Sequence, residues 1–209
     1  QNSKINYNVI QQGNIYSNSI HSTGINQGYN SKLNYNSFTL DGKFTRNDIE
    51  INLKNNSSEI NFQGLFLGNQ NNTIDYHTII NHKSPNCSSN EKFQGILKDK
   101  AKGVFNGLIN VFPKAINTDS NQQNRNLLLS DFATMNSNPQ LEILCDNVSC
   151  THGSTTGHLD EEMIFYLRSR GVDKIKAKHM LISGFAREII NNVSDDCVKN
   201  FLYNKIDKW

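Results

Sequence analysis

From Ser3 to about Cys150 the apolar positions of the chain come in short alternating runs, separated by Gly, Asn, Asp and Ser. Examples are Ile49-Ile51-Leu53, Ile60-Phe62 and Phe105-Gly107-Ile109-Val111. A period of two predicts many short β-strands, as in a sandwich, a barrel or a parallel β-helix. Convincing two-residue hairpin turns are lacking, which favours a solenoid whose rungs stack on one another.

After Gly157 the apolar period becomes that of helices. A first helix is expected to start at Leu159 or Asp160, with Gly171 suited to its C-terminal end and Asp173 to the cap of the next helix. A third start is expected at Ser194-Asp195-Asp196. We therefore predict two regions, a β-helix core over residues 1–157 and a small helical bundle over 158–209.

The composition limits the kinds of partner and the cellular compartment that we expect. The formal net charge is +2, no basic run occurs, and no apolar stretch is long enough to span a bilayer, so neither nucleic acid nor membrane is expected as a partner. Four irregularly spaced cysteines do not make a disulfide framework and fit an intracellular compartment. Roughly one residue in six is Asn, which indicates an AT-rich genome and also suits tight turns and side-chain ladders.

The string Cys150-Thr151-His152 is the sharpest chemical feature of the chain. On a strand, a spacing of two places the thiol and the imidazole on one face. Both are preferred ligands of iron and zinc, although two ligands cannot close a tetrahedral site. We therefore expect a metal or sulfur site at an edge or interface.

The blocks DGKFTRNDIEINL, NRNLLLSDFA, PQLEILCDNVSCTHGSTTG and LDEEMIFYLRSRG carry a resemblance to a known family. In this order they are similar to the C-terminal core of the SufD proteins, which belong to the SufB/SufD family of scaffold subunits in SUF iron–sulfur cluster assembly. The similarity covers about Asp41 to Val193, and residues 1–40 fit only loosely. Because the chain begins with Gln and matches a C-terminal core, we expect it to be a C-terminal fragment.

The resemblance implies a right-handed parallel β-helix in a non-catalytic scaffold that pairs with SufB and with the ABC-type ATPase subunit SufC. It implies that His152, with Cys150 secondary, faces a nascent cluster at the subunit interface. No tightly bound cofactor is expected, only transient iron or an iron–sulfur cluster, and a homodimer is an alternative assembly. The segment that contacts SufC in the family includes Asp160, Glu161, Phe165, Arg168 and Arg170. An apicoplast-like plastid stroma is the favoured location, with the bacterial cytoplasm as the alternative.

Other features have simpler structural interpretations. We interpret Cys145 as a small buried hydrophobe and Cys197 as part of a helix core. His77, His82 and Cys87 have ligand types without a recognised metal spacing, and we place them in a β-helix turn.

Two alternative functions stay open, a carbohydrate-acting β-helix enzyme and a purely structural partner that never contacts iron. No phosphate-binding loop, dinucleotide fingerprint or nucleophile elbow is present, which argues against an ATPase activity within the chain.

Overall fold

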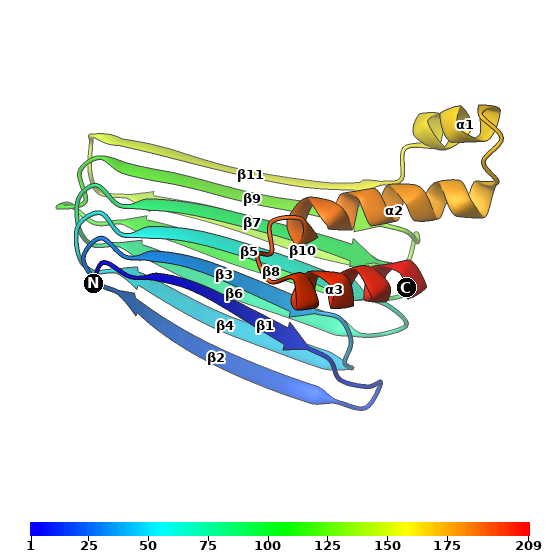
Figure 1. The fold of residues 1–209 in the computed structure, drawn as a ribbon, viewed down its shortest axis with the longest axis horizontal. Helices are drawn as coiled ribbons and strands as arrows, with labels where there is room; N and C mark the ends of the chain where they lie inside the picture. The colour runs from blue at the N-terminus through cyan, green and yellow to red at the C-terminus, as the bar shows by residue number, and fades with distance from the viewer.

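The computed structural model describes residues 1–209 as eleven strands followed by three helices (Figure 1). Sheet A contains β1 (Lys4–Gln11), β3 (Lys32–Thr39), β5 (Glu59–Gly68), β7 (Ser88–Leu97), β9 (Thr118–Leu128) and β11 (Val148–His158), in that order. Sheet B contains β2 (Asn18–Gln27), β4 (Phe44–Leu53), β6 (Thr73–His82), β8 (Lys102–Val111) and β10 (Thr134–Ile143).

Successive strands alternate between the two sheets, and all pairing within each sheet is parallel. The chain therefore winds through about five turns of a parallel β-solenoid, which confirms the predicted parallel β-helix. Residues 1–40 supply the first rungs, as expected. In the central turns each residue lies beside the residue 29 positions further on, as Ile60 does beside Ser89.

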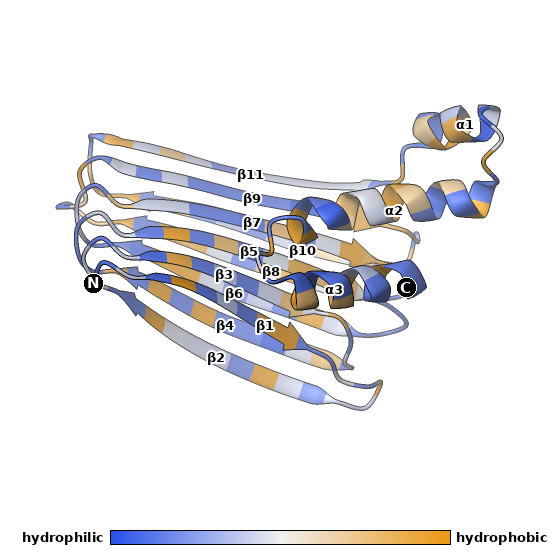
Figure 2. Ribbon diagram, in the orientation of Figure 1, coloured by the Kyte–Doolittle hydropathy of each residue, from blue (hydrophilic) through white to orange (hydrophobic).

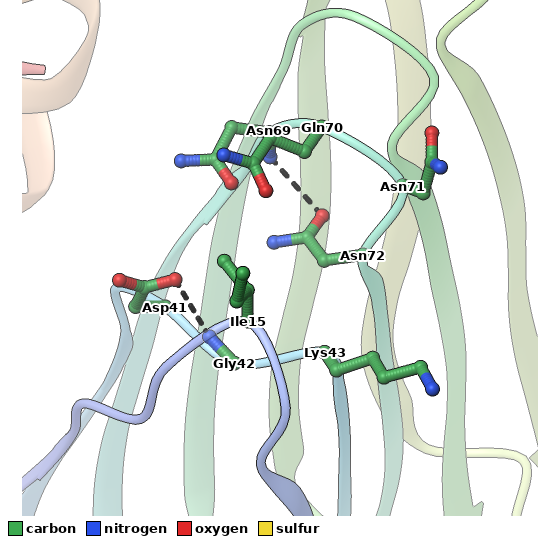
Figure 3. A pocket seen from close by; sticks show the side chains of 8 residues that line it. All are labelled: Ile15, Asp41, Gly42, Lys43, Asn69, Gln70, Asn71 and Asn72. Carbon is green, nitrogen blue, oxygen red and sulfur yellow. Dashed lines mark hydrogen bonds between the residues drawn. The ribbon is translucent and has the colours of Figure 1, made fainter.

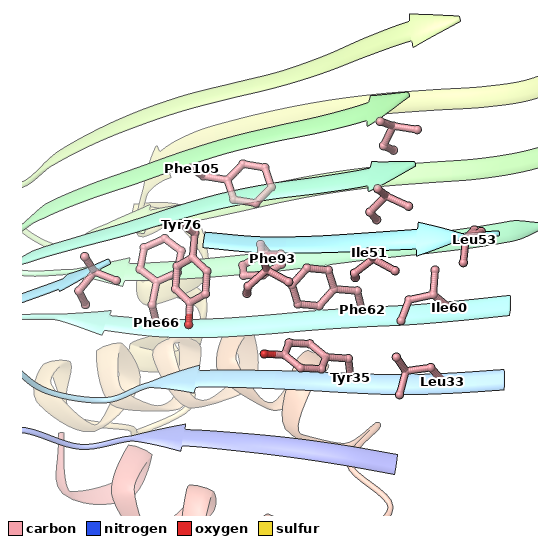
Figure 4. Packing of buried hydrophobic residues seen from close by; sticks show 14 of the residues in the cluster. Leu33, Tyr35, Ile51, Leu53, Ile60, Phe62, Phe66, Tyr76, Phe93 and Phe105 are labelled. Carbon is pink, nitrogen blue, oxygen red and sulfur yellow. The ribbon is translucent and has the colours of Figure 1, made fainter. Parts of the chain in front are cut away.

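The space between the two sheets, called the lumen below, holds a core of 20 buried residues. A run of aromatic rings forms its centre (Figure 4). The centroids of Tyr35 and Phe62 are 5.0 Å apart, and those of Phe62 and Phe93 are 4.9 Å apart. Each such pair contributes about 0.5–1.5 kcal/mol beyond the apolar area that it buries.

Asparagine columns run along the solenoid, as the abundance of this residue suggested. On the outer face of sheet A, Asn34 donates to Asn6 over 2.7 Å and Asn61 donates to Asn34 over 3.1 Å. A second column occupies the turns, where Asn117 donates to Asn86 over 3.0 Å and both have φ of 57°. Asparagine tolerates this left-handed conformation better than most residues, so the turns and the ladders use the same side chain.

The helices begin at the predicted capping residues. They are α1 (Glu161–Ser169), α2 (Lys174–Ile190) and α3 (Asp196–Lys208). Asp160, Asp173 and Asp195 each accept two backbone N–H groups of the first turn, a cap that contributes about 1 kcal/mol. Gly171 has φ of +86° after α1. None of the three helices is both long enough and apolar enough to cross a membrane.

The three helices confirm the predicted C-terminal helical region, in which α2 contacts both α1 and α3. α2 and α3 also lie on the outer face of sheet A, near the C-terminal ends of its strands, and α1 projects beyond them (Figure 1). A second core of 12 buried residues joins the two layers; it includes Phe38, Leu65 and Leu127 of the solenoid and Ile189 and Leu202 of the helices. The outer faces of these strand ends are apolar, so the helices pack on the sheet as well as on one another.

The assignment of Cys197 to a helix core was wrong. This residue lies in the first turn of α3 and is exposed. Leu202 and Ile206 are the buried residues of that helix, so Cys197 stands outside its apolar stripe.

Candidate functional site

The last rung of the solenoid is open at both of its strands. β11 pairs only with β9, and β10 pairs only with β8. The free side of each strand therefore presents backbone N–H and C=O groups with no partner in this chain. The Cys150-Thr151-His152 string lies near the start of β11, at the end of sheet A away from the helices (Figure 1).

Cys150 and His152 project from the same face of β11, as their spacing predicted. Cys150 lies beside Ser120 of β9, and His152 lies beside Gln122. Cys150 is half-buried and packs against the lumen core, whereas His152 is exposed. The inner face of the edge strand therefore carries one thiol and one imidazole side by side.

The thiol of Cys150 is mostly protonated at neutral pH. Partial burial raises its pKa, and the nearby Asp119 carboxylate and Cys145 thiol raise it further. Cys145 is also half-buried and follows the end of β10. A metal ion would have to displace the proton of Cys150, because the thiolate is the binding form.

No group of three or more His, Cys, Asp or Glu side chains lies close enough to hold a metal ion within this chain. Tetrahedral sites of the zinc or iron–sulfur type use four protein or solute ligands. The two donors on β11 can therefore form only part of such a site, and the remaining ligands must come from another molecule.

The two edge strands differ in how they are protected against pairing. β10 contains Pro139 near its middle and Glu142 near its end, and such residues disfavour strand addition. β11 has neither proline nor a charged residue between Val148 and Gly157. The unprotected edge is thus the one that carries Cys150 and His152.

The lumen becomes polar toward this open end, a feature that the sequence patterns did not reveal. The inward residues of β9 are all buried and polar from its start to residue 126: Thr118, Ser120, Gln122, Asn124 and Asn126. Figure 2 shows β9 as hydrophilic over most of its length. On β7, Glu91 is fully buried in the same region. Burial raises the pKa of this carboxyl to about 7, and a hydrogen bond from Gln122 opposes that shift.

A spacing of about 30 residues between rungs is the one signal in the sequence that relates the buried polar residues to His152. Glu91, Gln122 and His152 are separated by 31 and 30 residues, and they occupy neighbouring positions of sheet A. Because the rungs vary by a few residues, the sequence alone does not fix this alignment.

The predicted partner-binding residues gather on and around α1. Asp160, Glu161, Phe165, Arg168 and Arg170 are all exposed. The exposed fractions of the apolar side chains on the helix are high: 54% for Met163, 72% for Phe165 and 58% for Tyr166. Only Ile164 of α1 is buried. Together with a hollow of about 480 Å³ between α1, α2 and the end of β11, these side chains form an uncovered apolar surface.

The placement of His77, His82 and Cys87 in a β-helix turn was wrong for the two histidines, which lie in β6, and the three side chains form no cluster. His77 lies on the outer face of sheet B, 3.0 Å from Asp75. His82 points into the lumen, where burial lowers its pKa to about 4, and Cys87 is buried in the following turn with its Sγ 3.3 Å from the Asn55 carbonyl. The alternation of strand faces separates the three side chains.

A smaller hollow of about 210 Å³ lies among the turns at the helix-bearing end of the solenoid (Figure 3). Asp41, Lys43 and several amides line it, with Ile15 as its single apolar side chain. Its amides are engaged in turn hydrogen bonds such as the one from the Asn69 backbone N–H to Asn72 Oδ1 (3.1 Å). We interpret this hollow as turn structure.

A parallel β-solenoid with a cysteine and a histidine on an unprotected end strand, and with exposed apolar side chains on a nearby helix, has the features of a protein that associates with other molecules. The particular family follows from comparison with known proteins. Residues 1–185 match the model of the family described as "SUF system FeS cluster assembly, SufBD core domain", and the chain belongs to this family. The match begins at residue 1, so the first 40 residues fit better than the sequence blocks suggested.

Several curated proteins are similar to the chain. The iron–sulfur cluster assembly protein SufD of Escherichia coli is 38% identical over 170 residues, which cover 81% of this chain and 40% of that protein. An iron–sulfur cluster assembly SufBD family protein of Synechocystis is 34% identical, with coverages of 83% and 38%. SufD of Plasmodium falciparum is 26% identical, with coverages of 90% and 13%. The chain thus spans less than half the length of these relatives.

Proposed function

We propose that this chain is the core of a non-catalytic scaffold subunit that pairs with SufB and SufC in a SufBCD complex. In this proposal a nascent iron–sulfur cluster, the cargo of the assembly, forms against Cys150 and His152 at the subunit interface. The observation that carries the proposal is the position of both side chains on β11, the unprotected last strand of the solenoid. Membership in a cluster-assembly family supports it.

Strand addition explains how an incomplete ligand set becomes complete. A second solenoid of the same fold that pairs along β11 would satisfy the free backbone groups of that strand. Its own last rung would then lie directly opposite Cys150 and His152, within reach of the same iron or sulfide. SufB is the proposed partner, and a second copy of this chain is the alternative.

The helical surface is the proposed docking site for SufC. Phe165 and Tyr166 are more than half exposed on α1, while α2 and α3 are anchored to sheet A. A few aromatic anchors usually carry most of the affinity of such a contact. Movements of the ATPase subunits would then reach the cluster site through β11, which leads directly into α1.

Two other functions have less support. The relatives are named as assembly proteins, which supports an assembly role over a carbohydrate-acting enzyme. A purely structural partner that never contacts iron differs from our proposal only in the role of His152 and Cys150. The experiment below is designed around that difference. For the location we propose a plastid, because the Asn-rich composition and the similarity to Plasmodium SufD proteins point the same way.

Anaerobic reconstitution with SufB and SufC tests the proposal. We expect the complex with His152→Ala to retain much less iron and sulfide than the wild-type complex, while its subunit composition is unchanged. His21→Ala is the matched control, because His21 is an exposed histidine on the end strand β2 at the other end of the solenoid. Equal iron and sulfide in the wild type, in His152→Ala and in Cys150→Ala would establish the purely structural alternative.

A further inference from the structure

A buried carboxyl occupies the lumen where an apolar side chain would pack more favourably. Glu91 has no exposed surface, and no cation lies close enough to influence its pKa. Burying an ionisable group without a counter-charge is costly. On one side its neighbour in sheet A is Phe62, and the row continues to Tyr35 and Tyr7. The row thus changes from aromatic to ionisable at β7.

On its other side Glu91 holds the amide of Gln122. The Nε2 of Gln122 donates a hydrogen bond to the Oε2 of Glu91 over 2.6 Å, and both side chains are fully buried. Gly107 of β8 makes room for this amide, since a Cβ at that position would lie 2.4 Å from Nε2. Above its pKa of about 7 Glu91 is a carboxylate, which accepts hydrogen bonds and cannot donate them. In this form Glu91 selects the orientation in which the Gln122 nitrogen faces it.

The same orientation leaves the amide oxygen of Gln122 without a partner. This Oε1 is buried and accepts no hydrogen bond from the chain. The next side chain of the row is His152 on β11, which lies beside Gln122 in register and on the same face. A neutral imidazole has one N–H to donate and one free nitrogen, and its surroundings decide which nitrogen is which.

We propose that Gln122, held in one orientation by Glu91, is a positioning residue for His152. Its free amide oxygen accepts a hydrogen bond from one ring nitrogen and leaves the other nitrogen unprotonated toward the partner edge. Histidines that bind metals commonly donate their second ring nitrogen to a carbonyl or carboxylate, which fixes the tautomer. The inference rests on the proposed function, because it assigns the row Glu91, Gln122 and His152 to the site on β11.

Nitrogen NMR of the metal-free 209-residue chain, labelled with ¹⁵N-histidine and kept at about pH 8.5, where Glu91 is a carboxylate, measures the tautomer directly. The chain has six histidines, and His152→Ala assigns the signal of interest. In the wild type we expect one neutral tautomer of His152 in roughly five- to tenfold excess, the range that one net hydrogen bond supplies. In Gln122→Met, and in the isosteric Glu91→Gln, the excess is expected to fall to within about twofold of that of an exposed histidine.

Gln94→Met is the matched control, because Gln94 is a buried amide on β7 whose row leads to Arg125 and Thr155 instead of His152. It should leave the His152 tautomer unchanged. The same tautomer ratio in the wild type, Gln122→Met and Glu91→Gln would overturn the inference, whatever the reconstitution shows. A tautomer ratio of His152 that falls in Gln122→Met and Glu91→Gln, together with full iron retention by His152→Ala, would have a different meaning. Gln122 would then position His152, but His152 would not contribute to the cluster.

Discussion

The hydroxyl of Ser154 on β11 donates a hydrogen bond to the hydroxyl of Ser137 on β10, with 2.7 Å between the two oxygens. Ser137 in turn donates to the Oδ1 of Asn124 on β9 over 2.7 Å. The last strands of the two sheets are thus joined across the lumen by polar contacts. The end rung therefore keeps its shape in the free chain and offers a prepared edge to a partner.

Lysines on the outer face of β11 should prevent partner pairing. We expect the double variant Gly153→Lys, Thr155→Lys to bind SufB at least tenfold more weakly, because charged side chains on an edge strand oppose strand addition. Gly153 has open space around its Cα, so the fold should not change. Asn138→Lys, Gln140→Lys on β10 is the control. Sedimentation of the mixed subunits measures the result, and undiminished association would exclude β11 as the interface.

Replacement of His152 should have only a small effect on stability. Its side chain is exposed, so we expect His152→Ala to lower the free energy of unfolding by no more than about 1.5 kcal/mol, the contribution of the one hydrogen bond to Gln122. Cys150 is half-buried against the core, so Cys150→Ala should cost about 1 kcal/mol. Urea unfolding compares the three proteins. A loss of more than about 2 kcal/mol for His152→Ala would mean that this histidine is structural.

Two buried groups in the lumen should give opposite dependences of stability on pH. In the folded chain the pKa of Glu91 is about 7, whereas a solvent-exposed glutamate has a pKa of 4.5. Raising the pH from 4.5 to 7 therefore lowers the free energy of unfolding, by up to about 3 kcal/mol. His82 has its pKa lowered from 6.5 to about 4, so lowering the pH through this range destabilises the fold by a similar amount.

Between about pH 4.5 and 6.5 the two contributions have opposite signs and largely cancel in the wild type. Glu91→Gln should remove one of them, and the variant should lose stability steeply on acidification below pH 6.5. His82→Gln should instead lose stability as the pH rises from 4.5 to 7. Urea unfolding at several pH values gives the three profiles. Parallel profiles for the wild type and Glu91→Gln would show that Glu91 titrates normally.

Glycines on the inner face of the strands leave space for aromatic rings. A Cβ on Gly64 would lie 2.0 Å from the ring of Phe93, so Gly64→Ala should destabilise the fold by about 1–3 kcal/mol through overpacking. Gly24 on β2 has no atom within 4 Å of such a Cβ, and Gly24→Ala should be neutral or slightly stabilising. Equal midpoints of urea unfolding for the two variants would contradict this account of the lumen.

A single substitution on α1 should separate docking of the ATPase subunit from folding. We expect Phe165→Ser to weaken SufC binding at least tenfold without changing the thermal midpoint, because the ring is 72% exposed. Tyr16→Ser is the control, since Tyr16 is 80% exposed in the turn between β1 and β2. Calorimetric titration measures both. Deleting all three helices is a poor substitute, because it would uncover Phe38 and Leu65.

Local patterns were sufficient to predict much of the fold. The alternating runs gave the strands, and the aspartates at positions 160, 173 and 195 gave the helix starts, because each signal depends only on nearby residues. The apolar face of α2 also predicts that this helix packs on the β-helix, and it does. The strands that it covers could not be predicted, because they depend on the apolar strand ends around Leu65 and Leu127.

The site was predicted only in part for a similar reason. Cys150 and His152 stand two residues apart, so a strand places them on one face without any long-range information. Gln122 and Glu91 reach the same row through the register of three rungs. In β9 almost every residue is polar, so alternation cannot distinguish inward from outward positions. The parallel stacking of the rungs in the structure shows which residues of β9 point inward.

The polar character of the lumen at the last rung also bears on symmetry. Two solenoids that meet through their last rungs bring like surfaces together, because the same strand, β11, faces its equivalent across a two-fold axis. An isologous contact of this kind uses the same edge of both subunits and closes after two of them, whereas a head-to-tail contact can repeat into a filament. The row that ends at His152 would then stand beside its own counterpart, so a pair of such subunits would present two copies of each donor around one axis.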